Sequence, residues 1–168
     1  MPAPALTPLA AAVLAAGEPE RVLEVECGSG DATLFLAREF PRARVRGVDR
    51  SEQAVREATA RVGLDPEGRV AFKLGRPRSL PFPEGHFDLV VLVDGAPAAT
   101  EAARVLRPGG KLVLAYTKYS RAPRGLRGWL LRRGLAGAGF ESVAVAEVGD
   151  GSFSVACLRG GDPAGAAD

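Results

Sequence analysis

Residues 22–30, Val22-Leu23-Glu24-Val25-Glu26-Cys27-Gly28-Ser29-Gly30, join a short apolar run to a loop that contains two glycines. An apolar run of this length is typical of a strand that is covered on both faces, and the amphipathic residues 32–40 that follow predict a helix. Glycines let a backbone approach a ligand closely, and a helix N-terminus offers free N–H groups to an anionic part of that ligand. The stretch therefore predicts a ligand-binding turn between a buried strand and a helix.

The same alternation of apolar runs and amphipathic stretches continues along the chain. The runs with the pattern of strands are Arg21–Val25, Arg44–Val48, Arg69–Leu74, Phe87–Val93, Lys111–Tyr116, Glu141–Val148 and Ser152–Arg159. Helices are predicted at Ala32–Phe40, at Glu52–Val62 with Ser51 as its cap, at Pro97–Leu106, at Arg124–Ala138, and near the N-terminus between Thr7-Pro8 and Gly17. This alternation predicts an α/β fold, a parallel sheet with helices on both sides. Only Gly149-Asp150-Gly151 separates the last two strands, so they form a hairpin and the final strand runs antiparallel.

Asp49 strengthens the prediction of a nucleoside site. It ends the second predicted strand about 20 residues after the glycine loop, where an acidic residue typically binds ribose hydroxyls. A dinucleotide fingerprint would have a third small residue three positions after Gly30, and Thr33 stands there instead. An NAD-binding oxidoreductase is therefore the weakest of the alternatives.

Five segments in order resemble the class I S-adenosylmethionine-dependent methyltransferases, specifically the small-molecule, methyltransferase type 11-like branch. They are residues 22–30, Gly47-Val48-Asp49-Arg50-Ser51, residues 79–88, residues 103–112 and Gly137-Ala138-Gly139-Phe140. The resemblance covers roughly residues 21–159. It implies a Rossmann-like three-layer α/β/α sandwich whose mostly parallel seven-stranded sheet has the order 3-2-1-4-5-7-6, with an antiparallel last strand.

The resemblance also implies a cofactor, S-adenosylmethionine, and an activity, methyl transfer by in-line displacement to an acceptor that the sequence does not identify. The implied cofactor-binding residues are Glu24, Glu26, Cys27, Gly28, Ser29, Gly30, Asp49, Arg50, Arg76, Pro77, Arg78, Val93 and Asp94. Asp94 is also the candidate catalytic base, at the end of the fourth strand beside the expected methyl position. A turn residue at this position is the alternative interpretation of Asp94.

Three departures from the family pattern concern function. Glu26 stands where the family usually has glycine, and it would bring a carboxylate near the methionine end of the cofactor. Arg76 stands where relatives often have an acid that accepts a hydrogen bond from adenine, and a guanidinium has only donors. The segments after the fourth and fifth strands are short, so the site is expected to be open. These departures motivate a second hypothesis, a methyltransferase-like protein without catalysis that acts as a partner subunit or as a sensor of S-adenosylmethionine or S-adenosylhomocysteine.

Other chemistry-bearing residues are expected to be structural. His86 begins the fourth strand at the edge opposite the cofactor, whereas Tyr116 and Tyr119 follow the fifth strand and are candidate substrate contacts. The basic segment 118–133 overlaps the helix predicted at Arg124–Ala138, which is expected to bury Trp129, Leu130, Leu135 and Ala138 while its arginines are solvated. An anionic surface such as RNA is the alternative partner of this segment.

Composition limits the remaining possibilities. The net charge of +2 over 168 residues does not by itself indicate nucleic acid. Cys27 and Cys157 form neither a disulfide framework nor a metal spacing, so no metal site is predicted and a reducing interior is expected. The apolar residues 3–16 lack a basic region and are too short to span a bilayer. We expect one cytoplasmic domain over residues 1–160, a disordered tail over 161–168, no membrane contact, and either a partner subunit or a second copy over the open site.

Overall fold

A computed structural model describes residues 6–120, 122, 123 and 125–160, with Ser142 placed by its backbone alone. Along the chain the elements are α1 (Thr7–Ala16), β1 (Arg21–Val25), α2 (Asp31–Glu39), β2 (Arg44–Asp49), α3 (Glu52–Ala60), β3 (Val70–Leu74), β4 (Phe87–Val93), α4 (Ala99–Val105), β5 (Leu106–Tyr116), α5 (Gly125–Gly137), β6 (Phe140–Val148) and β7 (Gly151–Leu158). The expected tail, residues 161–168, lies outside the described residues, as do Arg121 and Arg124 of the basic segment.

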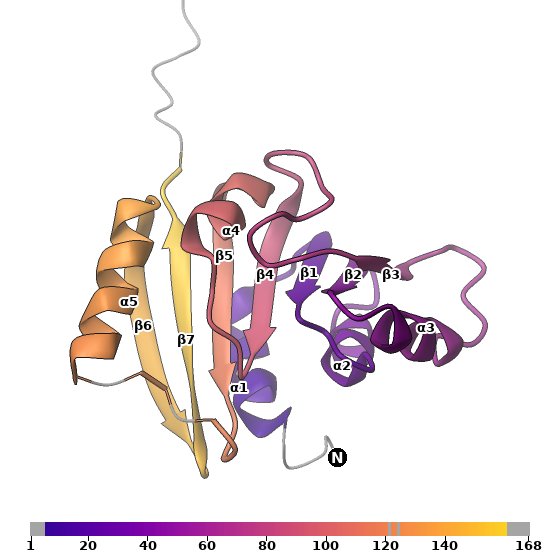
Figure 1. Cartoon of the computed structure of the whole chain (residues 1–168), viewed down its shortest axis with the longest axis horizontal. Coiled ribbons are helices and arrows are strands. Elements are labelled where there is room, and N and C mark those ends of the chain that lie inside the picture. Colours follow the sequence, from indigo (N-terminus) through magenta and orange to yellow (C-terminus); the bar gives the residue numbers. More distant parts are fainter. Residues whose placement is uncertain (1–5, 121, 124, 161–168) are drawn as a thin grey trace, which may run out of the picture.

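One seven-stranded sheet runs through the molecule in the order β3-β2-β1-β4-β5-β7-β6 (Figure 1). β1 pairs in parallel with β2 and with β4, and β7 pairs antiparallel with both β5 and β6. The hairpin between β6 and β7 turns at Gly149, whose φ of 56° lies in the left-handed region that glycine favours. The predicted order and the antiparallel last strand are both confirmed.

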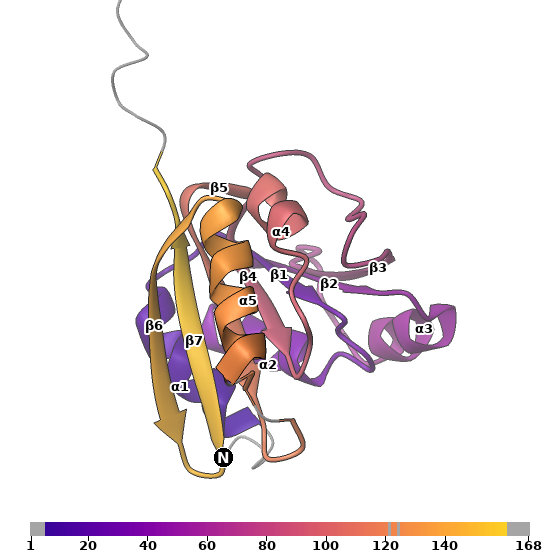
Figure 2. The same ribbon diagram turned by 60° about the vertical axis from the view of Figure 1, so that its left-hand side comes forward.

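Two apolar layers, one on each face of the sheet, explain why the strands have nearly continuous hydrophobic sequences. On one face α1 and α2 pack against residues such as Val22, Val45 and Leu89, and on the other α4 and α5 pack against Leu23, Val90 and Leu112. Figures 1 and 2 show the two pairs of helices on opposite sides of the sheet. This is the predicted three-layer sandwich. α3 begins as predicted, with the Ser51 hydroxyl accepting a hydrogen bond from the Ala54 N–H at 3.2 Å.

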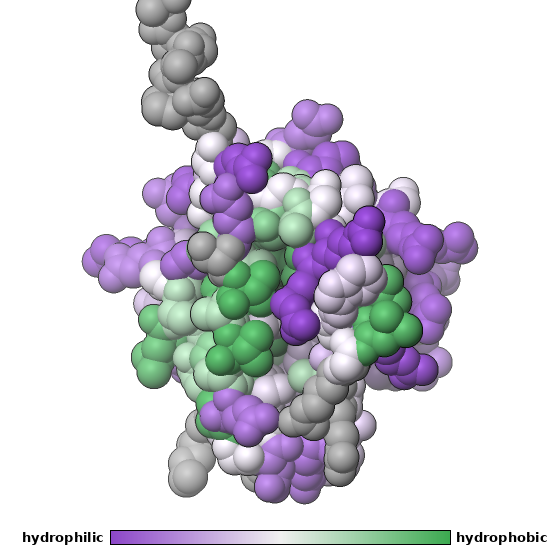
Figure 3. Space-filling view, turned by 90° about the vertical axis from the view of Figure 1, so that its left-hand side faces the viewer, coloured by the Kyte–Doolittle hydropathy of each residue, from purple (hydrophilic) through white to green (hydrophobic). Residues whose placement is uncertain are grey.

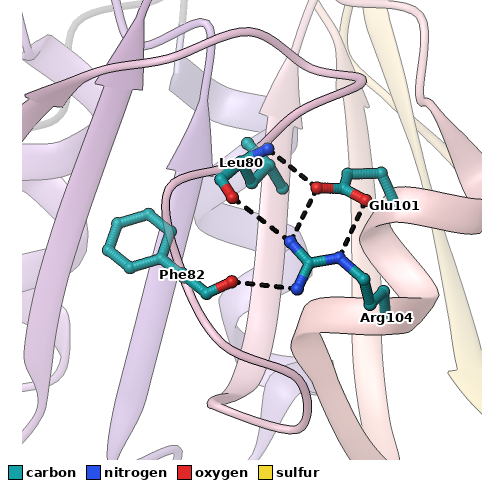
Figure 4. Close-up of polar contacts among 4 residues, drawn as sticks. All are labelled: Leu80, Phe82, Glu101 and Arg104. Atoms are coloured by element: carbon teal, nitrogen blue, oxygen red, sulfur yellow. Dashed lines mark hydrogen bonds and ion pairs between the residues drawn. The ribbon is translucent and has the colours of Figure 1, made fainter.

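The connection from β3 to β4 contains no helix, and α4 fixes its path. Glu101 accepts a hydrogen bond from the Leu80 N–H at 2.8 Å, and Arg104 donates from Nε and Nη2 to the Glu101 carboxylate. Arg104 also donates to the carbonyls of Phe82 at 2.9 Å and Leu80 at 3.2 Å (Figure 4). These bonds tie residues 80–82 over the sheet in place of a crossover helix. On the face that α4 and α5 cover, no helix of the described residues lies over the amino ends of β1, β2 and β3.

Two expectations about local structure are wrong. The sequence predicts that the fifth strand begins at Lys111, but β5 begins at Leu106. Its pairing with β4 moves from Phe87↔Leu106 to Leu89↔Lys111, so the extra residues form an irregularity within the strand. In α5, Leu135 is buried as expected, whereas Trp129 is 47% exposed and Leu130 is 53% exposed. Figure 3, which views this side of the molecule, shows hydrophobic surface over β6 and α5.

Candidate functional site

The glycine loop is fixed by the carboxylate of Asp49. Asp49 Oδ2 accepts a hydrogen bond from the Gly28 N–H at 2.9 Å, and Oδ1 accepts one from the Ser51 N–H, also at 2.9 Å. One side chain at the end of β2 therefore joins the loop after β1 to the start of α3. Each oxygen keeps a lone pair that can accept a further hydrogen bond. Asp49, which the sequence predicts as the ribose-binding acid, thus contacts the glycine loop directly.

Gly28 and Gly30 are required for different reasons. Gly28 has φ of 52°, and no atom lies within 4 Å of the position that a Cβ would take. Gly30 has φ of 87°, and its Cβ would approach Phe72 Cζ at 2.8 Å and Ala58 Cβ at 3.1 Å. Gly28 therefore provides open space beside the loop. Gly30 allows the loop to pack against α3 and β3, a role that the sequence pattern did not reveal.

Glu24 is a buried carboxyl group at the base of the loop. It is 3% exposed, and one of its oxygens accepts a hydrogen bond from the Thr33 hydroxyl of α2. Burial raises the pKa of Glu24 to about 8, against a smaller opposing effect of the hydrogen bonds from Thr33. Glu24 is therefore largely neutral at pH 7. A cation bound nearby would favour its ionised form.

Two further carboxylates, those of Glu26 and Asp94, follow the adjacent strands β1 and β4. Within the described chain they are the two non-glycine residues with positive φ, at 60° and 56°. Such backbone conformations cost about 1–2 kcal/mol each for a residue with a Cβ and occur preferentially at functional sites. A Cβ on Gly95 would lie 3.0 Å from Glu26 Oε2, so the Glu26 carboxylate reaches across to the end of β4.

Asp94 is already engaged by β5. Its Oδ1 accepts a hydrogen bond from the Thr117 N–H at 2.7 Å, and its Oδ2 accepts one from the Thr117 hydroxyl at 2.6 Å. The Asp94 N–H in turn donates to the Ala115 carbonyl at 2.8 Å. This geometry makes Asp94 a connection between the ends of β4 and β5. It supports the interpretation of Asp94 as a turn residue rather than as a free base.

A pocket of about 470 Å³ opens at the carboxyl ends of β1, β4 and β5. Seven of the predicted cofactor residues line it: Glu24, Glu26, Cys27, Gly28, Ser29, Val93 and Asp94. The remaining wall comes from residues that sequence reasoning did not select: Leu6, Asp31, Ala32, Leu34, Phe35, Arg38, Arg61 and Thr117, together with the predicted substrate contact Tyr119. The volume is within the range of small-molecule sites. Gly30 packs beneath the loop, and Asp49 supports it from the side of β2.

Arg61, at the end of α3, is a second clamp on the loop. Its Nη1 donates to the Ser29 carbonyl at 2.8 Å, and its Nη2 forms an ion pair with Asp31 at 2.6 Å. Asp31 begins α2, so this contact fixes the helix N-terminus together with the loop. No local motif marks an arginine that acts on a loop 32 residues earlier in the chain. Only the packing of α3 against the loop brings the two together.

The segment Arg76-Pro77-Arg78 does not line this pocket. Arg76 forms a backbone bridge with Ser79, and its side chain is exposed. Arg78 borders a separate hollow of about 430 Å³ together with residues 97–101. The segment nevertheless begins beside the ribose-binding candidate, because the Gly75 N–H donates to the Asp49 carbonyl at 3.0 Å. Arg50 follows Asp49 directly and is exposed.

Burial and location separate the remaining candidate residues, which are two tyrosines, one cysteine and one histidine. Cys27 is 6% exposed, and burial raises the pKa of its thiol to about 12, so it is an inert packing residue. Tyr116 is 5% exposed, with burial raising its pKa, while Tyr119 is 78% exposed at the rim of the pocket. His86 lies beside Phe82 and Phe87, at the opposite end of the sheet as predicted.

Comparison with known proteins agrees with this geometry. The family described as "Methyltransferase domain" matches residues 22–110, more than half of the chain. A demethylmenaquinone methyltransferase of Thermus thermophilus is 36% identical over 125 residues, which are 68% of this chain and 54% of the relative. The ubiquinone/menaquinone biosynthesis C-methyltransferase UbiE of Geobacter sulfurreducens is 36% identical over 103 residues, or 56% of this chain and 40% of the relative.

Solved structures share the fold. The PH0226 protein of Pyrococcus horikoshii has a TM-score of 0.71 at 23% identity, covering 92% of this chain and 89% of that one. A putative methyltransferase in complex with the Haloferax volcanii Trm112 methyltransferase activator gives a TM-score of 0.72 at 18% identity, covering 92% and 90% of the two chains. The chain spans about half or less of the curated relatives that it matches. No helix among the described residues has the length and apolar character needed to cross a membrane. The matched segment contains the glycine loop, Asp49 and Asp94, and the chain belongs to the class I S-adenosylmethionine-dependent methyltransferase family.

Proposed function

We propose that this protein binds S-adenosylmethionine in the pocket beside the glycine loop and transfers its methyl group to a small-molecule acceptor. One observation carries the proposal: the pocket of about 470 Å³ has the open side of Gly28 and the carboxyl groups of Glu24 and Glu26 in its wall. Open space at Gly28 suits close approach of a ligand to the backbone. Carboxyl groups suit a ligand that carries positive charge at one end.

The residues present fit this cofactor. Asp49 would accept hydrogen bonds from the ribose hydroxyls through the lone pairs that Gly28 and Ser51 leave unused. Arg50 would border the same end of the ligand. The segment Arg76–Arg78 would lie on the adenine side, where backbone groups must supply the acceptors because arginine has none.

Glu24 and Glu26 would receive the methionine end. A cationic ammonium or sulfonium group favours the ionised form of a nearby carboxyl group. Because burial raises the pKa of Glu24 to about 8, binding near pH 7 would release a proton from it. The affinity for the cofactor should consequently rise with pH between about 6 and 8.

Methyl transfer itself requires a base only where the acceptor nucleophile must lose a proton, as a phenol or a quinol does, and that proton would pass to a base or to solvent. When bound, S-adenosylmethionine would supply a methyl carbon that an acceptor nucleophile attacks in line, while the bond from that carbon to the sulfonium sulfur breaks and S-adenosylhomocysteine leaves. Orientation supplies most of the catalysis in such a reaction. Asp94 would contribute by fixing the wall between β4 and β5, because both of its oxygens accept hydrogen bonds from Thr117. Tyr119, exposed at the rim, would contact the acceptor.

The acceptor class is proposed from the relatives. Those that match this chain include methyltransferases of demethylmenaquinone and of fatty acids. A small apolar molecule with a phenolic, carbanionic or carboxylate nucleophile is therefore the acceptor to test first. The exposed rim at Tyr119 would suit a partner subunit or a second copy as a cover, and one structural neighbour is a putative methyltransferase in complex with an activator.

The test measures S-adenosylhomocysteine by mass spectrometry after incubation of the protein with S-adenosylmethionine and, separately, 1,4-naphthoquinol and a long-chain fatty acid. We expect product with at least one acceptor, and its loss in Asp49→Ala but not in Glu39→Ala, an exposed control. Binding of the cofactor without turnover of any acceptor would favour the alternative, a binding subunit or sensor. Absence of binding would contradict both.

A further inference from the structure

Three arginines gather at the amino ends of β1 and β2, at the end of the sheet opposite the glycine loop. The strand register places Arg21 directly opposite Arg44, and Arg46 opposite Leu23. Because side chains alternate along a strand, all three share the face of Leu23 and Val48. Arg21, Arg44 and Arg46 line a hollow of about 340 Å³ together with His86 and Phe87. We call this hollow the arginine pocket.

Asp65 partly offsets the charge of Arg46, but among the described residues no carboxylate pairs with the guanidinium groups of Arg21 and Arg44. The nearby Asp88 is occupied: its Oδ2 accepts the N–H groups of Glu20 at 2.6 Å and Arg21 at 2.8 Å, and its Oδ1 pairs with Arg107 Nε at 2.7 Å. Within the described part of the chain, the guanidinium groups of Arg21 and Arg44 form no ion pair. Like charges directly opposite each other in neighbouring strands are destabilising. The pair Arg21 and Arg44 therefore destabilises the fold unless an anion binds between the two guanidinium groups.

Two backbone carbonyls hold the Arg46 side chain in a position from which it can bind an anion. Its Nη1 donates to the carbonyls of Val45 at 3.0 Å and Arg69 at 2.8 Å, which orients the guanidinium and leaves its other N–H groups for a ligand. The wall beside it is aromatic, since His86 and Phe87 meet at a centroid distance of 4.9 Å and Phe82 stacks on His86 at 6.2 Å.

The positive potential is also reflected in His86. Burial lowers the pKa of His86, and Arg21, Arg46 and Lys73 lower it further, against the opposing effect of Asp88. The pocket remains accessible because the β3–β4 connection has no helix that could cover these strand ends. Exposed Lys73, whose Nζ lies 5.3 Å from the Phe82 ring centroid, extends the positive surface.

We propose that the arginine pocket binds the phosphate group of a small phosphorylated ligand, at a site separate from the methyl-transfer pocket. Guanidinium groups match the geometry of phosphate oxygens through paired N–H donors. Three of them around one hollow can contact an anion of two or more charges, which would remove the repulsion between Arg21 and Arg44. Pyrophosphate is the simplest probe with this chemistry.

His86 is the only histidine of the chain and serves as the reporter. Its imidazole is followed by NMR as a function of pH, with and without millimolar pyrophosphate. We expect the anion to raise the pKa of His86 by about 1, because a bound negative charge stabilises the imidazolium. We expect Arg44→Gln and Arg21→Gln to weaken pyrophosphate binding at least about tenfold, since each removes a charged donor. Arg56→Gln on α3 makes the same change of charge at a distant exposed site and should leave binding unchanged.

The proposal is wrong if pyrophosphate does not move the pKa of His86, or if the arginine variants respond like the wild type while circular dichroism shows them folded. It is also wrong if a short single-stranded RNA moves the pKa and pyrophosphate does not, because the site would then serve a polymer. S-adenosylhomocysteine should leave this pKa unchanged. The experiment therefore does not depend on methyltransferase activity.

Discussion

Asp94 and Thr117 form a two-point contact that joins the ends of β4 and β5, with Oδ1 2.7 Å from the Thr117 nitrogen and Oδ2 2.6 Å from its hydroxyl. The contact stabilises a left-handed backbone at Asp94, whose φ is 56°. It lies in the wall of the pocket that also contains Glu26 and Gly28. The proposed cofactor site thus depends on a connection between two strands.

Asp94→Asn and Thr117→Val should have similar and non-additive effects. Each removes one side-chain hydrogen bond of the pair and should lower the free energy of unfolding by about 1–2 kcal/mol, as measured by urea unfolding. The double variant should lower the free energy of unfolding by less than the sum of the two single variants, because the residues act as one unit. If Asp94→Asn abolished methyl transfer while Thr117→Val left both turnover and stability unchanged, Asp94 would be a base and this account of it would be wrong.

Gly28→Ala and Gly30→Ala form a matched pair. Both place a Cβ on a left-handed backbone, which costs about 1 kcal/mol, but only the Cβ of Gly30 meets Phe72 and Ala58. We therefore expect Gly30→Ala to lose about 3 kcal/mol of stability. Gly28→Ala should lose about 1 kcal/mol and should mainly weaken binding of S-adenosylhomocysteine. Thermal unfolding and calorimetry distinguish the two, and equal losses of stability would contradict the different roles of the glycines.

Glu24 should make the protein less stable as pH rises. Its carboxyl group has a pKa of about 8 in the folded state and an ordinary value of 4.5. Between these values the folded state binds the additional proton, so stability falls with increasing pH by up to about 1.4 kcal/mol per unit. Below pH 4.5 both states are protonated and the effect is absent.

The control for this effect is Glu24→Gln, which keeps an acceptor for the Thr33 hydroxyl but does not titrate. Urea unfolding from pH 5 to 8 should show a shallower slope in Glu24→Gln than in the wild type, whereas the exposed Glu39→Gln should keep the wild-type slope. If the stability of Glu24→Gln fell with pH as steeply as that of the wild type, the carboxyl group of Glu24 would not be the source of the pH dependence.

Glu26→Gly should stabilise the fold and weaken the site. Glycine removes the strain of φ at 60° and should raise the free energy of unfolding by up to about 1 kcal/mol. Loss of the carboxylate that lies against Gly95 in the pocket should reduce affinity for S-adenosylhomocysteine about tenfold. Calorimetry on the folded variant measures this. A large gain in affinity would instead favour the alternative of a decayed, non-catalytic site.

Local patterns predicted the fold because the elements that define it are local. The apolar run and glycines of residues 22–30, the Ser51 cap and the Gly149 hairpin each act within a few residues, and all are found where the sequence places them. The start of β5 was missed, because Pro108-Gly109-Gly110 has the composition of a turn although it lies within a strand.

Only part of the site could be predicted, because some of its contacts join residues that are distant in the sequence. Asp49 ends β2 and Glu26 follows β1, and the carboxyl ends of these strands must meet in a parallel sheet, so the proximity of the two residues could be anticipated. The contacts of Arg61 with Ser29 and of Thr117 with Asp94 join residues more than 20 positions apart, and no periodicity reports them. The packing of Phe72 under Gly30 belongs to the same class, since it requires the three-dimensional path of β3.

Titration calorimetry with S-adenosylhomocysteine tests the central claim most directly. The account predicts one site per chain with micromolar affinity. Binding should be tighter at pH 8 than at pH 6, because the ammonium group of the ligand favours ionised Glu24. Binding should be strongly weakened in Asp49→Ala. No heat of binding at millimolar ligand, with the protein shown to be folded, would contradict the claim that the pocket beside Gly28 is a cofactor site.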